Sequence, residues 1–197
     1  ALRRRIRLPR LRDVQPLAII VGILLLFFVL QKDLGPALVL GSMALGLYGV
    51  ARARSGLVAA GFALLAAGFA AGYWLGIPGT LARRVAIWLD PWHNGLVGGD
   101  QIAHAQWALA SGGAWGLGSG LGEGQLIPAG HTDLITAVMG EELGFAGLIA
   151  IAAVFAVIIW RILRIAARAP GDYTAFLALG CALSLAVPAL VIVGGML

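Results

Sequence analysis

The sequence predicts an all-α fold, a polytopic integral membrane helix bundle with a large extracytoplasmic loop that carries short interfacial helices. Hydrophobic residues make up 60% of the chain and charged residues 12%, which leaves too little polar surface to cover a water-soluble core. Apolar runs approach the roughly 20 residues that a helix needs to cross a membrane. Arginines flank these runs, so the net charge of +5 indicates membrane topology and no nucleic acid partner.

The predicted spans follow one another along a single membrane domain, residues 1–197. They cover residues 16–31, 34–51, 57–77, 143–160 and 174–197. The first run follows a basic stretch, as in a signal peptide, but it ends in Gln31-Lys32-Asp33, where a cleavage site would have small residues. We therefore predict that this run stays in the membrane as a span.

Basic residues set the predicted orientation of the spans. They precede the first span, separate the second from the third, and follow the fourth: Arg3, Arg4, Arg5, Arg7, Arg10 and Arg12; Arg52 and Arg54; Arg161, Arg164 and Arg168. Counting crossings puts these three places on one side, and the positive-inside rule makes that side cytoplasmic. The loop over residues 78–142 is therefore predicted to be extracytoplasmic.

The ends of the sequence suggest a longer protein. The chain begins with Ala1 instead of Met and stops within an apolar run at Leu197. We expect it to be a fragment of a larger membrane protein that has further spans on both sides.

The loop at residues 78–142 is far longer than the usual connection of about 4–6 residues, and loops of this length are usually functional or disordered. Its composition argues against disorder, because it is rich in tryptophan: Trp88, Trp92, Trp107 and Trp115, with Trp74 just before it. Indole rings favour the membrane interface, so anchoring is the simpler interpretation of the tryptophans alone.

Two segments of this loop have readable local structure. Residues 101–110 have helical spacing of apolar residues and end in Ser111-Gly-Gly, which predicts a short interfacial helix. The glycine-rich run at residues 112–124 is not a phosphate-binding P-loop, because no Gly-Lys-Ser/Thr follows. Its glycines predict tight backbone turns near a bulky ligand.

A polar triplet, His131-Thr132-Asp133, directly precedes a helical pattern over residues 134–143. Thr132 or Asp133 is well placed to cap that helix. The functional alternative is that Asp133, partly desolvated at the membrane surface, acts as a general base.

The same helical pattern carries Glu141 and Glu142. We expect at least one of them to form an ion pair, with Arg83 or Arg84 as partner, because an unpaired carboxylate at a membrane boundary is costly.

The histidines His93, His104 and His131 all fall in the loop, which opens the alternative of a metal site. Their spacing matches no HExxH pattern, and catalytic zinc normally needs three convergent protein ligands. The sequence therefore leaves a histidine-ligated metal as a minor alternative.

A series of motifs resembles the SEDS family, which includes RodA, FtsW and SpoVE. The motifs are Gln31-Lys-Asp-Leu-Gly35, Arg84-Val-Ala-Ile-Trp-Leu-Asp-Pro91, Gly99-Asp-Gln101, Ser111-Gly-Gly113, Trp115-Gly-Leu-Gly118, His131-Thr-Asp-Leu-Ile135 and Gly140-Glu-Glu-Leu-Gly-Phe-Ala-Gly147. Their order and spacing agree with the family over most of the chain.

The resemblance implies an inverting peptidoglycan glycosyltransferase of the bacterial cytoplasmic (inner) membrane that polymerises lipid II for cell shape or division. Asp133 matches the family's catalytic aspartate and Arg84 its basic position, so Arg84, with Arg83 second, is expected to bind the diphosphate. The other expected substrate-binding residues are Gln101, His131, Thr132 and Glu142.

The resemblance also implies lipid II as substrate, undecaprenyl diphosphate as leaving group and a class B penicillin-binding transpeptidase as partner. A divalent cation, Mg²⁺ or Mn²⁺, could share the neutralisation of the diphosphate. We do not expect the fragment alone to be active. Two alternatives stay open: a transporter (flippase) of the lipid-linked precursor, and a non-catalytic scaffold for the transpeptidase.

Overall fold

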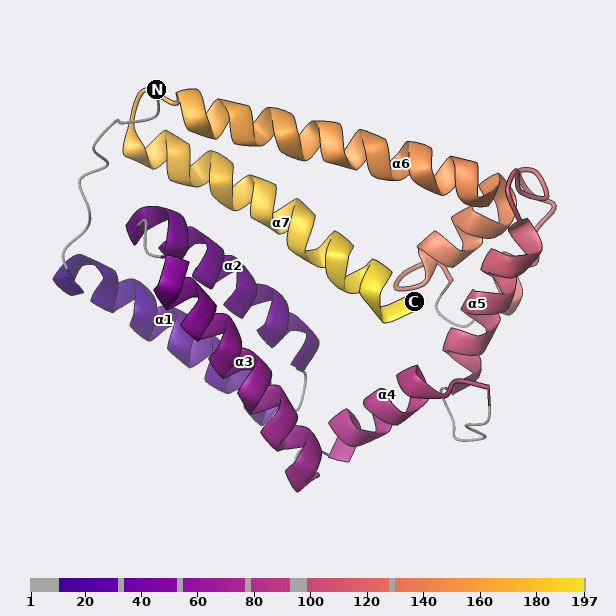
Figure 1. Cartoon of the computed structure of the whole chain (residues 1–197), viewed down its shortest axis with the longest axis horizontal. Coiled ribbons are helices and arrows are strands. Elements are labelled where there is room, and N and C mark those ends of the chain that lie inside the picture. The colour runs from indigo at the N-terminus through magenta and orange to yellow at the C-terminus, as the bar shows by residue number, and fades with distance from the viewer. Residues whose placement is uncertain are drawn as a thin grey trace. The chain divides into compact units, whose positions relative to one another are not determined.

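The computed structural model of the chain describes residues 11–31, 34–52, 55–76, 79–92, 99–127 and 130–196. Every regular element in these ranges is a helix, which confirms the predicted all-α fold (Figure 1). The elements are α1 (Leu11–Leu30), α2 (Leu34–Arg52), α3 (Ser55–Leu75), α4 (Gly79–Leu89), α5 (Gly99–Gly112), the short 3-10 helix η1 (Gly124–Leu126), α6 (Ile135–Arg168) and α7 (Asp172–Met196). Several residues used above lie outside the described ranges: Arg3, Arg4, Arg5, Arg7, Arg10, Lys32, Asp33, Arg54, Ile77, His93 and Leu197.

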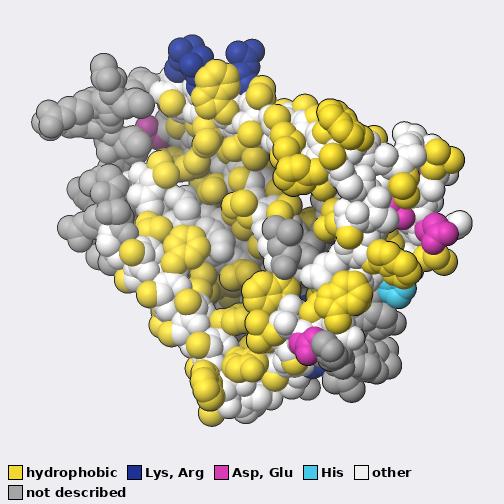
Figure 2. Space-filling view, turned by 45° about the vertical axis from the view of Figure 1, so that its right-hand side comes forward, with side chains coloured by type: hydrophobic (Ala, Val, Ile, Leu, Met, Phe, Trp, Pro, Cys, Tyr) yellow, Lys and Arg dark blue, Asp and Glu magenta, His cyan; other side chains and the backbone are white. Residues whose placement is uncertain are grey.

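Each predicted span coincides with a helix. Three stretches of the described helices are long and apolar enough to cross a membrane: Val58–Leu75 in α3, Ile135–Arg168 in α6 and Asp172–Gly195 in α7. The helices α1 and α2 contain shorter apolar stretches, Ile19–Phe28 and Gly35–Ala51. Hydrophobic side chains cover much of the visible surface (Figure 2), as expected where the solvent is lipid. On the helices, Leu64 is 75% exposed and Leu190 73%.

The described chain forms two compact units. The first contains α1, α2 and α3 together with residues 159–188, which are the end of α6 and most of α7. Glycines of α2 lie at its helix contacts: a Cβ added at Gly41 would be 3.6 Å from Leu65, and one added at Gly46 would be 3.1 Å from Leu183. Small residues allow such close approach between membrane helices, where lipid removes the usual hydrophobic drive for association.

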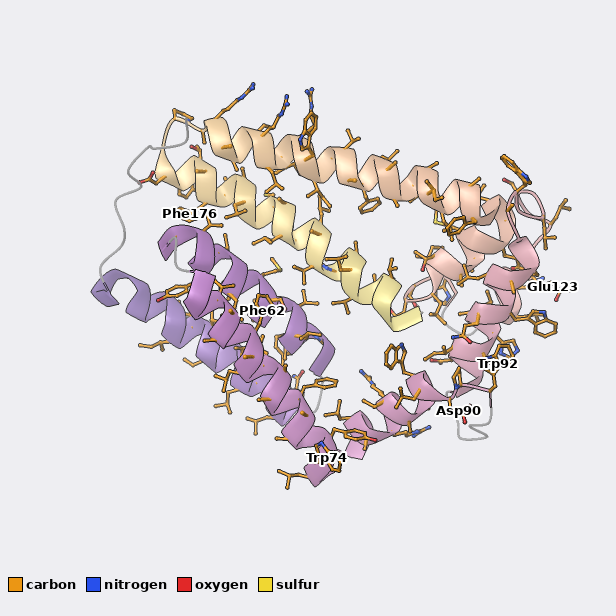
Figure 3. The ribbon with its side chains drawn as sticks, viewed as in Figure 1. Phe62, Trp74, Asp90, Trp92, Glu123 and Phe176 are labelled. Atoms are coloured by element: carbon orange, nitrogen blue, oxygen red, sulfur yellow. The ribbon has the colours of Figure 1, made fainter. Side chains whose placement is uncertain are left out.

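The second unit covers residues 83–158 and 189–197, and its first helix is most of α4. The tryptophans and the two arginines of this segment did not by themselves predict a helix. The helix is amphipathic: Ile87 is buried, whereas Arg83 and Arg84 are exposed. It ends before Asp90 and Trp92 (Figure 3). The predicted loop, residues 78–142, therefore contains this short helix as well as α5.

The predicted helix at residues 101–110 is confirmed as α5, which extends by two residues at each end. It ends in the predicted Ser-Gly-Gly stop, where the Ser111 hydroxyl donates a hydrogen bond to the Ala108 carbonyl at 3.0 Å. The helix packs in a small core with residues that follow η1 and begin α6: Ala105, Ala108, Ile127, Leu134 and Ala137, with Leu109 and Val138 at its edge. We call these seven residues the loop core.

Candidate active site

The helix α6 is broken at Gly144, where φ is 68° and ψ is −176°. In an unbroken α-helix each N–H donates to the carbonyl four residues earlier, so Phe145 would pair with Glu141 and Ala146 with Glu142. A break at Gly144 disrupts such bonds, so the N–H groups of Phe145 and Ala146 and the carbonyl groups of Glu141 and Glu142 need other partners. Buried backbone groups of this kind must find other partners, because an unmade hydrogen bond is costly.

The glycine-rich loop supplies partners for all four groups. The hydrogen bonds run from Leu117 N–H to the Glu141 carbonyl (2.9 Å), from Gly118 N–H to the Glu142 carbonyl (3.0 Å), from Phe145 N–H to the Gly113 carbonyl (2.9 Å) and from Ala146 N–H to the Ala114 carbonyl (3.0 Å). We call this arrangement, residues 113–118 bonded to residues 141–146, the loop–kink clamp. It holds the kink in place with four hydrogen bonds between the loop and the helix.

Glycine is required in the clamp for two reasons. Gly116 and Gly118 have φ values of 82° and 108°, which other residues adopt only under strain. A Cβ at Gly112 or Gly116 would also collide with the carbonyl oxygen of Gly140 or Glu142, respectively. The predicted tight turns are therefore confirmed, and the backbone of α6 lies against Gly112 and Gly116. The bulky ligand near this loop stays a prediction.

The polar triplet lies on a turn just before α6. The Gly130 amide donates a hydrogen bond to the Ile127 carbonyl at 3.0 Å, and a Cβ at Gly130 would lie 2.9 Å from the Gly124 carbonyl oxygen. Leu134 is buried in the loop core, whereas His131, Thr132 and Asp133 are exposed. The loop core thus anchors the residue next to Asp133 and leaves the Asp133 carboxylate accessible.

The predicted site residues lie on separate segments of the structure. His131, Thr132 and Asp133 share one turn, and Glu142 is half-buried at the loop–kink clamp. Gln101 is exposed in the first turn of α5, and Arg83 and Arg84 are exposed on α4. Among the described residues, no hydrogen bond or ion pair joins Arg84 or Gln101 to Asp133, so their convergence on one substrate stays a prediction, as does capping by Thr132 or Asp133.

Glu141, for which the sequence predicts only a candidate ion pair, has a distinct environment in the structure. Its side chain is only 6% exposed, and its Oε2 atom accepts no hydrogen bond from any residue that the structure describes. A Cβ added at Gly122 would lie 2.9 Å from this oxygen, so the glycine-rich loop covers the carboxyl group. Among the described residues this oxygen has no arginine partner, so the ion pair predicted for at least one of the two glutamates is not seen at Glu141 Oε2.

Glu141 Oε2 is a buried acceptor without a donor among the described residues, and it should lower the stability of the protein. Replacing Glu141 with Met keeps the length of the side chain and removes a buried acceptor that has no donor, so Glu141→Met should stabilise the full-length parent by about 1–3 kcal/mol. Thermal unfolding in detergent should show a higher Tm. The control is Glu142→Met, in which the neighbouring side chain is half-buried, and its Tm should change little. A lower Tm for Glu141→Met than for the control would show that the carboxylate has a stabilising partner.

The described residues give no support to a histidine-ligated metal. His104 is half-buried on α5 and His131 is exposed on its turn, while His93 is outside the described ranges. Within those ranges, no group of three or more His, Cys, Asp or Glu side chains could hold a metal ion.

The predicted interfacial tryptophans present much of their surface to the surroundings. Trp74 is 84% exposed, Trp115 85%, Trp107 65%, Trp92 62% and Trp88 47%. This exposure is compatible with the predicted anchoring in the membrane interface, which stays a prediction.

Comparisons with known proteins cover almost the whole chain. The family model FTSW_RODA_SPOVE, described as "Cell cycle protein", matches residues 2–197. The peptidoglycan glycosyltransferase RodA of Mycobacterium leprae (strain TN) is 37% identical over 188 residues, which are 95% of this chain and 40% of that protein. The RodA of Mycobacterium tuberculosis (strain ATCC 25618 / H37Rv) is 37% identical over 192 residues, again 95% of this chain and 40% of that protein.

A second group of relatives has a different name. The probable peptidoglycan glycosyltransferase FtsW of Geobacter sp. (strain M18) is 33% identical over 184 residues, which are 89% of this chain and 48% of that protein. The chain therefore spans less than half the length of the curated relatives described here.

Proposed function

The chain belongs to the FtsW, RodA and SpoVE family, and we propose that the protein containing it is a peptidoglycan glycosyltransferase that polymerises lipid II. The observation that carries the proposal is Asp133, which is exposed on a turn anchored by the loop core, within the motif that resembles the family's catalytic one. The names of the relatives support the same reaction class.

The proposed reaction starts at the sugar 4-hydroxyl of one lipid-linked chain. Asp133 takes the proton of this hydroxyl. The hydroxyl oxygen at the same time attacks the anomeric carbon of the other substrate, and a new C–O bond forms. The bond from the anomeric carbon to the diphosphate breaks on the opposite side, which inverts the configuration and releases undecaprenyl diphosphate. A positioned base of this kind contributes about 10²–10⁴-fold to a rate.

The leaving group needs positive charge nearby, since two phosphates gain charge as the bond breaks. Arg84 and Arg83 are exposed on α4 and are the proposed diphosphate-binding residues. Gln101, His131, Thr132 and Glu142 are proposed to bind the sugars. The guanidinium fork is suited to phosphate oxygens, which it can bind in a bidentate manner.

The chain is part of a bacterial inner-membrane protein. We propose that residues 78–142 face outward, where the polymer is made, and that a class B penicillin-binding transpeptidase is the partner. A divalent cation, Mg²⁺ or Mn²⁺, is proposed as a further means of neutralising the diphosphate. The described residues contain no group of three or more acidic, His or Cys side chains that could hold a metal ion.

A polymerisation assay tests the proposal. The full-length parent, purified and incubated with lipid II, should convert it into glycan strands that electrophoresis resolves as a ladder. The transporter alternative predicts movement of labelled lipid II across proteoliposome membranes without polymer. The scaffold alternative predicts neither activity, and either result would overturn the proposed function.

A further inference from the structure

Three arginines near the end of α6 form a basic face of their own. Arg161, Arg164 and Arg168 are three, four and seven residues apart, and residues at such spacings lie on the same side of an α-helix. All three side chains are exposed. Figure 3 shows nitrogen-tipped side chains projecting from the end of α6 that leads into α7.

The charge of this face is not neutralised within the described part of the chain. No ion pair to the three arginines is found among the described residues, and the next acidic residue along the chain, Asp172, begins α7. In the view of Figure 2, Lys and Arg side chains gather at one edge of a face that is mostly hydrophobic. A concentrated positive charge at the end of an apolar helix attracts anions at that level of the membrane.

Trp160 contacts Arg164 and orients its guanidinium group. The guanidinium carbon of Arg164 lies 4.0 Å from the centroid of the Trp160 ring, in a cation–π contact. Stacking uses the face of the guanidinium and leaves its in-plane N–H donors available, and these donors match the oxygens of a phosphate. The contact therefore orients Arg164 before a ligand arrives.

We propose that Arg161, Arg164 and Arg168 bind the phosphate groups of anionic phospholipids. The neighbouring surface favours a lipid over a free phosphate, because exposed apolar side chains of α6 lie three or four residues from these arginines: Ile165 is 63% exposed and Trp160 49%. An amphiphile can place its phosphate on the arginines and its acyl chains along α6. This goes beyond the positive-inside rule, which predicts only the side of the membrane on which arginines lie.

Native mass spectrometry of the detergent-purified full-length parent tests the site. Phosphatidylglycerol is titrated against wild type and a triple variant, Arg161→Gln, Arg164→Gln and Arg168→Gln. Each basic residue near an anionic surface contributes about a factor of five to affinity, so the triple variant should bind about 100-fold more weakly. Zwitterionic phosphatidylcholine should bind weakly and equally to both proteins.

Conservative variants separate recognition from charge. Changing all three arginines to Lys keeps the charge and removes the planar fork, so we expect an affinity between those of wild type and the triple Gln variant. Trp160→Phe should retain most of the binding, whereas Trp160→Ala should weaken it several-fold. If the triple Gln variant does not fold, Arg164→Gln alone should still weaken binding about fivefold.

Two results would overturn the proposal. One is unchanged affinity for phosphatidylglycerol in the Gln variants, which would reduce the arginines to a topological role. The other is displacement of the lipid by inorganic phosphate at an equal concentration, which would indicate a site for a soluble anion. Neither readout depends on glycosyltransferase activity.

Discussion

Asp133→Asn in the full-length parent is expected to lower the rate of glycan-strand formation by about 10²–10⁴-fold, the usual contribution of a general base. Asparagine has the same shape as aspartate and is an equally good helix cap, so the turn before α6 should keep its structure. The loss should therefore appear in kcat, with little change in Tm. The measurement is the time course of lipid II polymerisation at saturating substrate.

Glu123→Gln is the matched control for this prediction. Glu123 is also an exposed carboxylate of the loop segment, and its side chain points away from α5 and α6 (Figure 3). Its substitution should leave polymerisation near the wild-type rate. If Asp133→Asn retained wild-type activity, the base would have to be another group, and the family motif would have misled the assignment.

The apolar runs predicted the long helices well, because hydrophobic length is a property of consecutive residues. Each predicted span has a corresponding helix among α1, α2, α3, α6 and α7. The same local information located α5, whose apolar spacing and Ser-Gly-Gly stop both lie within one segment. Features encoded by neighbouring residues could be read directly from the sequence.

Features that depend on contacts between distant segments could not be read in this way. The break at Gly144 needs partners from residues 113–118, about thirty residues away along the chain, and no periodicity reports such pairing. The close approach of Gly112 and Gly116 to the backbone of α6 is likewise a contact between distant segments. The helix α4 was missed because its two arginines and its tryptophans were interpreted by their chemistry and not by their helical spacing.

Glu141 shows the same limit for the candidate site. Two adjacent glutamates look equivalent in the sequence, and the analysis expected an ion pair from at least one of them. In the structure Glu141 is buried under Gly122, whereas Glu142 is half-buried. The difference arises from the side of α6 that the loop covers, which only the tertiary contacts determine.

The contribution of the loop–kink clamp to stability can be measured by comparing Gly116 with Gly120, two glycines of similar backbone conformation. Gly116 has a φ of 82° and Gly120 a φ of 76°, so alanine is strained at both positions. A Cβ at Gly116 would collide with the Glu142 carbonyl, whereas at Gly120 it would meet no described atom within 4 Å. The comparison separates backbone strain from the close approach to α6.

Gly120→Ala should therefore cost only the strain, about 1–2 kcal/mol. Gly116→Ala should cost at least about 3 kcal/mol, because it adds the loss of clamp hydrogen bonds worth about 0.5–1.5 kcal/mol each. Hydrogen exchange should locate the damage, with faster exchange at the amides of Leu117, Gly118, Phe145 and Ala146 in Gly116→Ala only. Equal destabilisation of the two variants would mean that the clamp contributes nothing beyond the strain of its turns.

A larger loss of polymerisation in Gly116→Ala would link the clamp to Asp133, because the first part of α6 connects the kink to that residue.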